Sequence, residues 1–295
     1  MEDRRLKSEA GLHRMRSLFR LLSSSFVKDW VEMETKIKNL LEEGRVDGFW
    51  AYKTAHGFPV PWLFTNENAH ELEPWQPTSA RYPLLKLLLA LSRQNPEKIY
   101  GILVRGCEER GLQELFKWSQ LDRNKVIALG QACSEEMALY CECRQPYPDR
   151  LDYGRAVAPV SKNDRIEGLH AMEMDERLDW WRTHMNRCIR CHGCRDVCPV
   201  CFCTECSLQH PDLIPGTELP PDTSFHLVRA VHMGGRCIDC GLCEEVCPAR
   251  IPLRSLYKEV NRLVEEIYGY TPGTEGAMSP FTFLGEELLL PQGPQ

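Results

Sequence analysis

The sequence predicts an α+β fold, in which an N-terminal α/β domain is followed by a mainly helical domain. A strand–helix–strand pattern over residues 99–129 supports the first part, because such a pattern forms a βαβ unit. The 15 cysteines mark the second part, since four lie before residue 150 and eleven lie between residues 188 and 247. We expect an α/β domain over residues 1–155, a cysteine-rich helical domain over residues 156–269 and a flexible tail over residues 270–295.

The N-terminal half begins with a predicted helix over residues 4–42. Residues 4–20 carry six Lys or Arg and one Glu, so they form either a solvated helix face or an arm that contacts an acidic partner. Residues 57–83 are rich in Pro and Trp and are predicted to be irregular. Residues 84–91 are apolar except for one lysine, which predicts a buried helix.

Three elements form the predicted βαβ unit. Residues 99–104 are short, apolar and partly β-branched, which is typical of a buried strand. Residues 108–119 follow as a helix with its leucines on one face, and residues 126–129 form the second strand. Further along the chain, apolar residues at helical spacing predict two more helices, over residues 225–233 and 253–268.

The composition argues against two classes of protein. The 295 residues carry a net charge of −6, whereas nucleic-acid-binding proteins usually carry a surplus of basic residues. No stretch of about 18 uncharged apolar residues is present, so we expect no membrane span. The odd number of cysteines fits poorly with a disulfide framework, and no clear export signal is evident. We therefore expect a cytoplasmic protein, in which clustered, reduced cysteines bind metal.

Two stretches share the spacing C-x2-C-x2-C-x3-C followed by proline, one starting at residue 188 and one at residue 237. This spacing is typical of 4Fe-4S cubanes, in which three cysteines hold one cluster and the fourth ligates the other. Cluster 1 is therefore predicted to use Cys188, Cys191, Cys194 and Cys247. Cluster 2 is predicted to use Cys237, Cys240, Cys243 and Cys198. Zinc fits these triplets poorly, because it takes four ligands in a tetrahedron.

Seven cysteines remain, and they leave alternatives open. The preferred third cluster draws ligands from both halves of the chain, namely Cys133, Cys143, Cys203 and Cys206. A zinc ion at the same place is the alternative metal. The remaining alternative is that these residues are small buried side chains or free thiols.

Cys107 lies at the turn between the first strand of the βαβ unit and its helix. A helix N-terminus lowers the pKa of a nearby thiol. Three interpretations stay open: Cys107 is a cluster ligand, a thiol beside a cofactor pocket, or a packed residue.

Four motifs carry a family resemblance: YGILVRGCEERGLQEL at residues 100–115, GQACSEE at 130–136, ECRQPYP at 142–148 and the cysteine-rich stretch at 187–206. They resemble the coenzyme F420 hydrogenase/dehydrogenase β-subunit family, which includes formate dehydrogenase β-subunit-like proteins. The resemblance covers roughly residues 97–250. The helices between and after the cluster loops also resemble the α-helical ferredoxin domain of succinate dehydrogenase and heterodisulfide reductase subunits.

The resemblance implies an iron–sulfur electron-transfer subunit without catalytic residues of its own. Such a subunit relays single electrons between a formate dehydrogenase or hydrogenase and a further acceptor, such as a heterodisulfide-reductase-like complex or a ferredoxin. The alternative is a flavin-containing subunit that binds FAD and exchanges hydride with a deazaflavin or nicotinamide coenzyme. In that case the flavin lies near Cys107, and Arg105 or Arg110 holds a phosphate at the helix N-terminus. Otherwise both arginines are surface residues.

Overall fold

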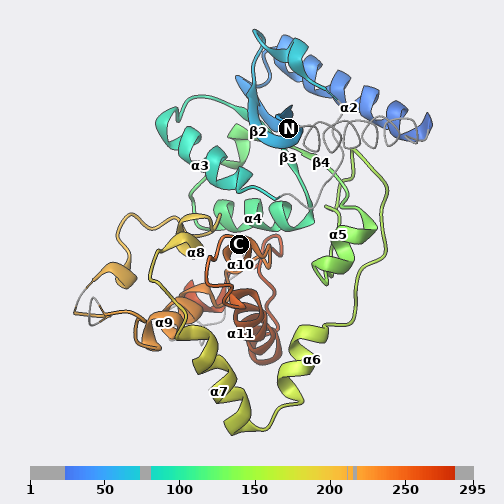
Figure 1. The fold of residues 1–295 in the computed structure, drawn as a ribbon. Coiled ribbons are helices and arrows are strands. Elements are labelled where there is room, and N and C mark those ends of the chain that lie inside the picture. The colour runs from blue at the N-terminus through green and yellow to red at the C-terminus, as the bar shows by residue number, and fades with distance from the viewer. Residues whose placement is uncertain (1–23, 74–80, 211, 215–217, 283–295) are drawn as a thin grey trace, which may run out of the picture.

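The computed structural model describes residues 24–73, 81–210, 212–214 and 218–282. It consists of a mixed sheet with helices near the N-terminus and a helical part that contains most of the cysteines (Figure 1). The predicted α+β fold is confirmed. The basic stretch at residues 4–20 and the end of the predicted tail, residues 283–295, lie outside the described residues.

The sheet has four strands in the order β2-β1-β3-β4. Their bounds are Gly48–Ala55 for β1, Phe58–Phe64 for β2, Tyr100–Val104 for β3 and Val126–Gly130 for β4. Strands β1 and β2 form an antiparallel hairpin, whereas β3 pairs in parallel with both β1 and β4. Helix α4 (Gly106–Lys117) connects β3 to β4, so the predicted βαβ unit is confirmed.

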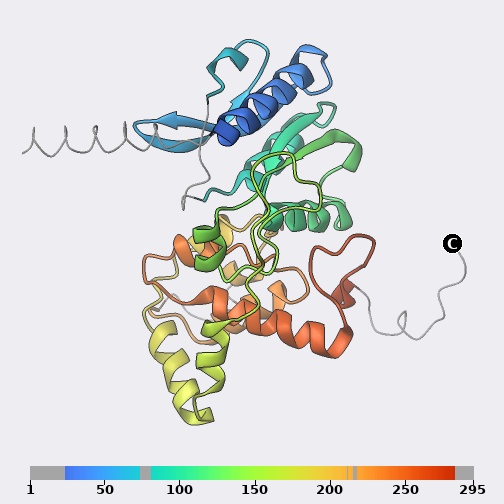
Figure 2. The same ribbon diagram turned by 90° about the vertical axis from the view of Figure 1, so that its right-hand side faces the viewer.

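The core of this part lies between the sheet and three helices, α2 (Ser24–Glu42), α3 (Leu84–Gln94) and α4. Strand β3 is buried along its whole length, as expected for a central strand covered on both faces. Both ribbon views show α4 between the sheet and the helical part (Figures 1 and 2). The N-terminal end of α4 is therefore placed beside the cysteine loops.

The expectation of irregular structure over residues 57–83 is wrong for its first part, because β2 occupies residues 58–64. Pro59 and Pro61 suggested a loop, yet both lie on an edge strand. Proline is tolerated there because one side of an edge strand needs no N–H donor for the sheet. The hairpin partner β1, which has no regular alternation of apolar and polar residues, was not predicted.

The second part of the chain is helical apart from its loops. Its helices are α5 (Glu135–Tyr140), α6 (Asp164–His170), α7 (Met174–Met185), α8 (Gly193–Asp196), α9 (Ser224–Met233), α10 (Leu242–Glu245) and α11 (Leu253–Tyr268). Among the described residues, 3-10 turns span Ala69–Glu71 and Arg123–Lys125 in the first part of the chain, and Ser207–Gln209 and Pro280–Thr282 in the second part. The predicted helices over residues 225–233 and 253–268 are confirmed by α9 and α11.

The end of β4 depends on a glycine. A Cβ atom on Gly130 would lie 1.9 Å from the carbonyl oxygen of Arg150. The Gly130→Ala variant is therefore expected to lose about 2 kcal/mol of unfolding free energy, the range of an overpacked core site. Gly168→Ala is the matched control, because a Cβ there meets nothing within 4 Å. Urea denaturation checks the prediction, and equal midpoints for the two variants would contradict it.

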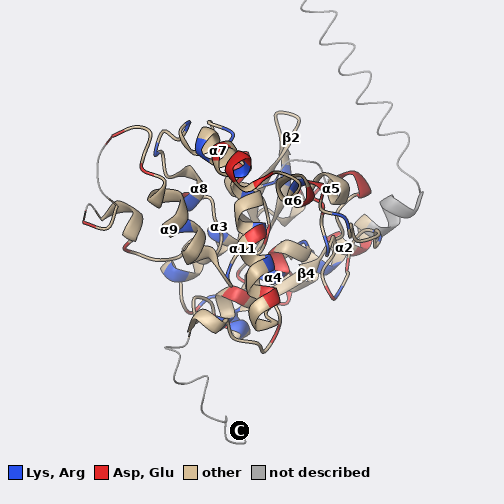
Figure 3. Ribbon diagram, turned by 90° about the horizontal axis from the view of Figure 1, so that it is seen from below, with Lys and Arg blue, Asp and Glu red and all other residues tan. Residues whose placement is uncertain are grey.

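No helix in the described ranges is long and apolar enough to cross a membrane. Acidic and basic residues are mixed along helices α4 and α7 in the view from below (Figure 3). Helices α3 and α9 carry basic residues and no acidic ones, although the chain as a whole has a net charge of −6.

Candidate metal centres

The two cysteine motifs fold into loops with the same backbone conformation. In the first loop, Arg190 and His192 have left-handed φ angles of 51° and 60°. In the second loop, Asp239 and Gly241 occupy the equivalent positions with φ angles of 56° and 76°. Each loop is followed by a one-turn helix, α8 or α10, and these two helices pack against each other. The repeated motif therefore gives a repeated structure.

Each loop contributes to two small cavities rather than one. The first cavity contains the cysteines Cys188, Cys191, Cys194 and Cys247. The second cavity contains the cysteines Cys237, Cys240, Cys243 and Cys198. The fourth cysteine of each motif therefore lies in the cavity that is lined by the first three cysteines of the other motif. The structure brings together the two sets that the spacing predicts, while iron ligation itself stays a prediction.

The surroundings of these thiols favour metal binding. Burial and the nearby Asp239 carboxylate raise the pKa of Cys237 to about 12. The backbone N–H of Arg190 donates a hydrogen bond to Cys188 Sγ at 3.4 Å, and such bonds stabilise a sulfur that carries negative charge. A buried thiolate needs a cation beside it, so metal-bound thiolates are favoured over free ones.

The arrangement of donors distinguishes a cubane from a single ion. A structural zinc needs four donors converging on one point, whereas a cubane needs one thiolate for each of its irons. Four cysteines line each cavity, which provides one thiolate for each iron of a cubane.

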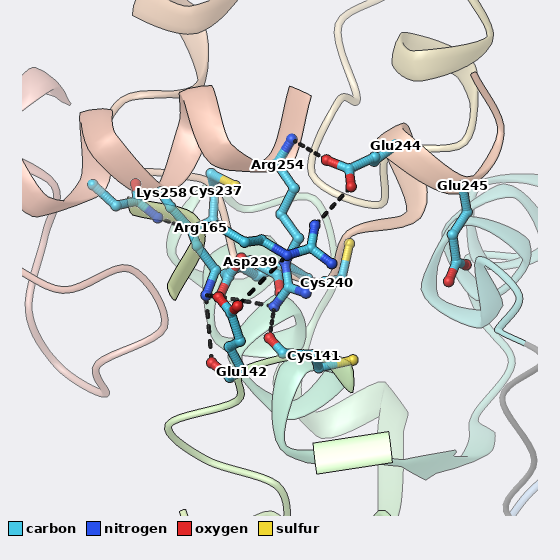
Figure 4. Close-up of polar contacts among 12 residues, drawn as sticks. Cys141, Glu142, Arg165, Cys237, Asp239, Cys240, Glu244, Glu245, Arg254 and Lys258 are labelled. Atoms are coloured by element: carbon cyan, nitrogen blue, oxygen red, sulfur yellow. Dashed lines mark hydrogen bonds and ion pairs between the residues drawn. The ribbon is translucent and has the colours of Figure 1, made fainter. Parts of the chain in front are cut away.

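A network of buried charges fixes the second loop (Figure 4). Arg254 donates to the Asp239 carboxylate at 2.7 Å, and its guanidinium also bonds the carbonyl oxygen of Cys141. Lys258 lies 3.4 Å from the Asp239 carboxylate and 3.9 Å from that of Glu142. The network thus ties the loop to helix α11 and to the segment that follows α5.

Arg81 makes a second link between the two parts of the molecule. It donates to the carbonyl oxygen of Cys240, pairs with Glu245 and lies 3.3 Å from Cys141 Sγ. Its side chain is 7% exposed. This arginine precedes α3, so the N-terminal part of the chain forms one wall around the second loop.

The residues predicted for a third cluster are placed in two different surroundings. Cys203 and Cys206 line a cavity of about 600 Å³ beside α9, together with Cys201. Cys133 follows β4, where burial, with a smaller contribution from Cys143, raises its pKa to about 12. The cavity that Cys203 and Cys206 line contains neither Cys133 nor Cys143, and the four-cysteine set stays a prediction.

Cys133 and Cys143 have other cysteines as neighbours. Cys107 follows β3 and Cys133 follows β4, and the carboxyl ends of adjacent parallel strands meet at one edge of a sheet. The N–H of Cys133 donates to the carbonyl oxygen of Pro146 at 2.8 Å. The residue before Cys107 packs against the same loop, since a Cβ on Gly106 would lie 2.2 Å from the carbonyl oxygen of Gln145. The adjacency of the two predicted strands is a sequence signal that could have indicated this grouping, although the predicted set paired Cys133 and Cys143 with Cys203 and Cys206.

The two arginines considered for a flavin phosphate are engaged by protein groups. Arg105 is 3% exposed, and it donates to the hydroxyl of Tyr52 at 3.0 Å. Arg110 donates to the carbonyl oxygen of Ile238 at 2.9 Å and to the side chain of Gln145 at 3.1 Å. Arg105 is therefore not the surface residue that one alternative expected, and Arg110 helps to position the second cysteine loop.

Curated proteins with similar sequences include two β subunits of F420-dependent formate dehydrogenases. The subunit from Methanocaldococcus jannaschii is 38% identical over 144 residues, and that from Methanococcus maripaludis is 41% identical over 145 residues. Each match covers 48% of this chain, but only 38% and 37% of those proteins. The chain thus spans well under half the length of the curated relatives it matches.

A more distant match is subunit alpha 1 of the acetyl-CoA decarbonylase/synthase complex of Methanosarcina mazei, which is 24% identical over 127 residues. That match covers 43% of this chain and 14% of the subunit. No protein-family profile matches the chain. The resemblance to the coenzyme F420 hydrogenase/dehydrogenase β-subunit family is confirmed over about half of the chain by the two formate dehydrogenase subunits.

Proposed function

We propose that this chain is an iron–sulfur electron-transfer subunit of an oxidoreductase complex. Two 4Fe-4S clusters, bound in the two cysteine cavities, supply reversible one-electron chemistry. The observation that carries this proposal is the exchange of Cys198 and Cys247 between the two cavities. In two-cluster ferredoxins the fourth cysteine of each motif ligates the other cluster, which holds the two clusters close together. Electron transfer between clusters needs this short distance, whereas a site for a single metal ion does not need the exchange.

The residues of the chain hold the two proposed clusters and shield them from water. The two loops pack most of their cysteines against Val200, Ile251 and Tyr257 in one buried cluster, whereas Cys191 is exposed. Backbone N–H groups point at sulfur, and Arg254 fixes the second loop through Asp239. The chain therefore binds, orients and insulates the centres, and it has no part in bond-making chemistry.

The proposed donor partner is a formate dehydrogenase or a hydrogenase, and the proposed acceptor is a heterodisulfide-reductase-like complex or a ferredoxin. The support comes from the two relatives, which are named as formate dehydrogenase β subunits. We place this activity in the cytoplasm, because cysteines must stay reduced to bind clusters.

A third centre is proposed on the other side of the second loop. Its proposed donors are Cys107, Cys133, Cys141 and Cys143. Their grouping is supported because Cys133 lies close enough to Cys143 and Cys141 for these thiols to raise its pKa, and Cys107 lies close enough to Cys133 for the same effect. Cys107 also shares a small cavity with Cys240, a predicted ligand of cluster 2. A centre at this place would extend the electron path into the N-terminal part of the chain.

The amount of iron tests the proposal directly. After anaerobic purification, two cubanes give about eight irons and eight acid-labile sulfides per chain, and a third cubane raises both to about twelve. Zinc without sulfide, or clearly fewer than eight irons in protein that was never exposed to air, would contradict the proposal. About eight irons per chain would contradict the third centre but would agree with the two predicted clusters.

The flavin-containing alternative is favoured by one observation. A cavity of about 600 Å³ beside Cys203 and Cys206 has the size of a cofactor site. It is not the predicted place beside Cys107, and its lining has four basic and two acidic residues: Lys86, Arg195, Arg229, Arg236, Asp196 and Glu205. Acid denaturation of the purified protein, followed by fluorescence of the supernatant, distinguishes the two functions. One flavin per chain would favour the alternative, and its absence would favour the relay of clusters alone.

A further inference from the structure

Helix α9 carries one arginine, Arg229, that lies between the two cysteine cavities. Its side chain is 2% exposed. Its Nη2 donates to the carbonyl oxygen of Cys194 in the first loop at 2.7 Å, and its Nη1 lies 3.3 Å from Cys201 Sγ. Arg229 also lines the cavity of the second cysteine set. A single guanidinium group therefore contacts the surroundings of both predicted clusters.

The positive charge of Arg229 has no carboxylate partner among the described residues. Its Nε atom is buried without a hydrogen-bond acceptor, and the nearest aromatic ring, that of Tyr257, is neutral. The other arginines near the second loop differ in this respect, because Arg254 pairs with Asp239 and Arg81 pairs with Glu245. A buried cation without a counter-charge is strongly unfavourable. Negative charge near Arg229 comes from sulfur: from the Cys201 thiol, whose pKa the hydrogen bond with Cys198 and the nearby Arg229 lower to about 5, and from the predicted clusters.

The predicted clusters supply part of that charge. A cubane with four thiolates is a dianion when oxidised and a trianion when reduced, and the net charge of a cluster helps to set its reduction potential. We propose that Arg229 is the counter-charge shared by both clusters, and that it raises both reduction potentials. This inference rests on the proposed function, because it needs both clusters to be bound.

The direction of the effect follows from Coulomb attraction. Reduction adds one negative charge to each cluster, and a cation within a few ångströms in a low-dielectric interior stabilises the added charge. Arginine suits this position because its planar fork reaches two acceptors at once, whereas the compact ammonium group of lysine does not. Arg229 thus acts through the clusters, as a residue that tunes their potentials.

Redox titrations followed by electron paramagnetic resonance test the proposal. In the Arg229→Gln variant the charge is lost, and the equilibrium constant for reduction of each cluster is expected to fall at least tenfold, or 59 mV for a one-electron couple. The Arg229→Lys variant keeps the charge but loses the fork, so its two potentials are expected to lie between those of wild type and Arg229→Gln. Iron content is measured on every variant.

Arg262→Gln is the control for the loss of a positive charge elsewhere on the chain. Arg262 lies on α11, is 43% exposed and pairs with Glu259 and Glu266, and no hydrogen bond in the described ranges joins its guanidinium to a cysteine loop. Its potentials are expected to match wild type. Unchanged potentials in Arg229→Gln with full iron, or a shift of one cluster only, would overturn the shared role. If Arg229→Gln fails to bind iron, unshifted potentials in Arg229→Lys would overturn it. Wild-type protein without clusters would instead refute the proposed function.

Discussion

Replacing Cys247 by alanine is expected to remove the cluster built on the first motif, although Cys247 belongs to the second motif in sequence. The reason is that Cys247 lines the cavity of Cys188, Cys191 and Cys194. A cubane needs a thiolate on each of its irons, so the loss of one ligand is expected to lower the iron content by about four per chain. Anaerobic iron analysis and electron paramagnetic resonance check this outcome.

Double variants identify which cavity is affected. Cys247→Ala combined with Cys191→Ala is expected to lose no more iron than either single variant, because both residues serve one cluster. Cys247→Ala combined with Cys240→Ala is expected to lose both clusters and to stop electron transfer. The opposite pattern would show that each motif keeps its own fourth cysteine. Cys206→Ala is the matched control, because Cys206 lines neither cavity of the predicted clusters.

The fold could be predicted from the sequence where local pattern decides the structure. The helix over residues 253–268 has a strong apolar face and ends at Gly269, whose φ of 62° suits a glycine. Strand β3 is apolar throughout, which is typical of a central strand. The β1–β2 hairpin could not be predicted in the same way. Two prolines in β2 suggested a loop, and only the position of this strand at the sheet edge makes them acceptable.

In the candidate site, too, the residues that are close in sequence could be predicted together, whereas those that are far apart in sequence could not. The two cluster sets follow from spacing because three of the four donors lie within seven consecutive residues, and the exchange of the fourth is a property of the motif. The third set was assembled from Cys133, Cys143, Cys203 and Cys206, and nothing local sets the distance between such remote pairs. The placement of Cys133 depends on how α4 packs against the loop near Pro146. The order of the parallel strands, which places Cys107 and Cys133 at one edge of the sheet, is known only from the structure.

Replacing Asp239 by asparagine is expected to destabilise the fold around the second loop by about 2 kcal/mol. This is below the range for a fully buried ion pair, because the Asp239 side chain is 25% exposed although its two partners are buried. Asp239 accepts hydrogen bonds from Arg254 and lies 3.4 Å from Lys258, and these two side chains are 4% and 8% exposed. Asparagine tolerates the left-handed backbone conformation of the turn. The variant therefore removes the charge of residue 239 and keeps its backbone conformation. Chemical unfolding, followed by the loss of cluster absorbance, measures the change.

The pH dependence of this variant separates lost charge from lost shape. Burial already lowers the pKa of Lys258, and the Asp239 carboxylate raises it in part. Without Asp239 the pKa of Lys258 is expected to fall further, so the lysine loses its proton below its ordinary pKa of about 10.4. A lysine with a depressed pKa destabilises the fold at neutral pH, and this penalty vanishes as pH rises through its unfolded pKa. The stability deficit of Asp239→Asn is therefore expected to shrink at alkaline pH.

The matched control lies on helix α11, where Glu259 pairs with Arg262 at 2.8 Å in a partly exposed position. Glu259→Gln is expected to cost less than about 1 kcal/mol, as is usual for exposed ion pairs. An equal loss in the two variants, or a deficit in Asp239→Asn that stays constant with pH, would contradict the role of the buried network. The comparison thus measures how strongly the chain holds its second cysteine loop, because Asp239 joins that loop to α11 and Arg254 joins α11 to Cys141.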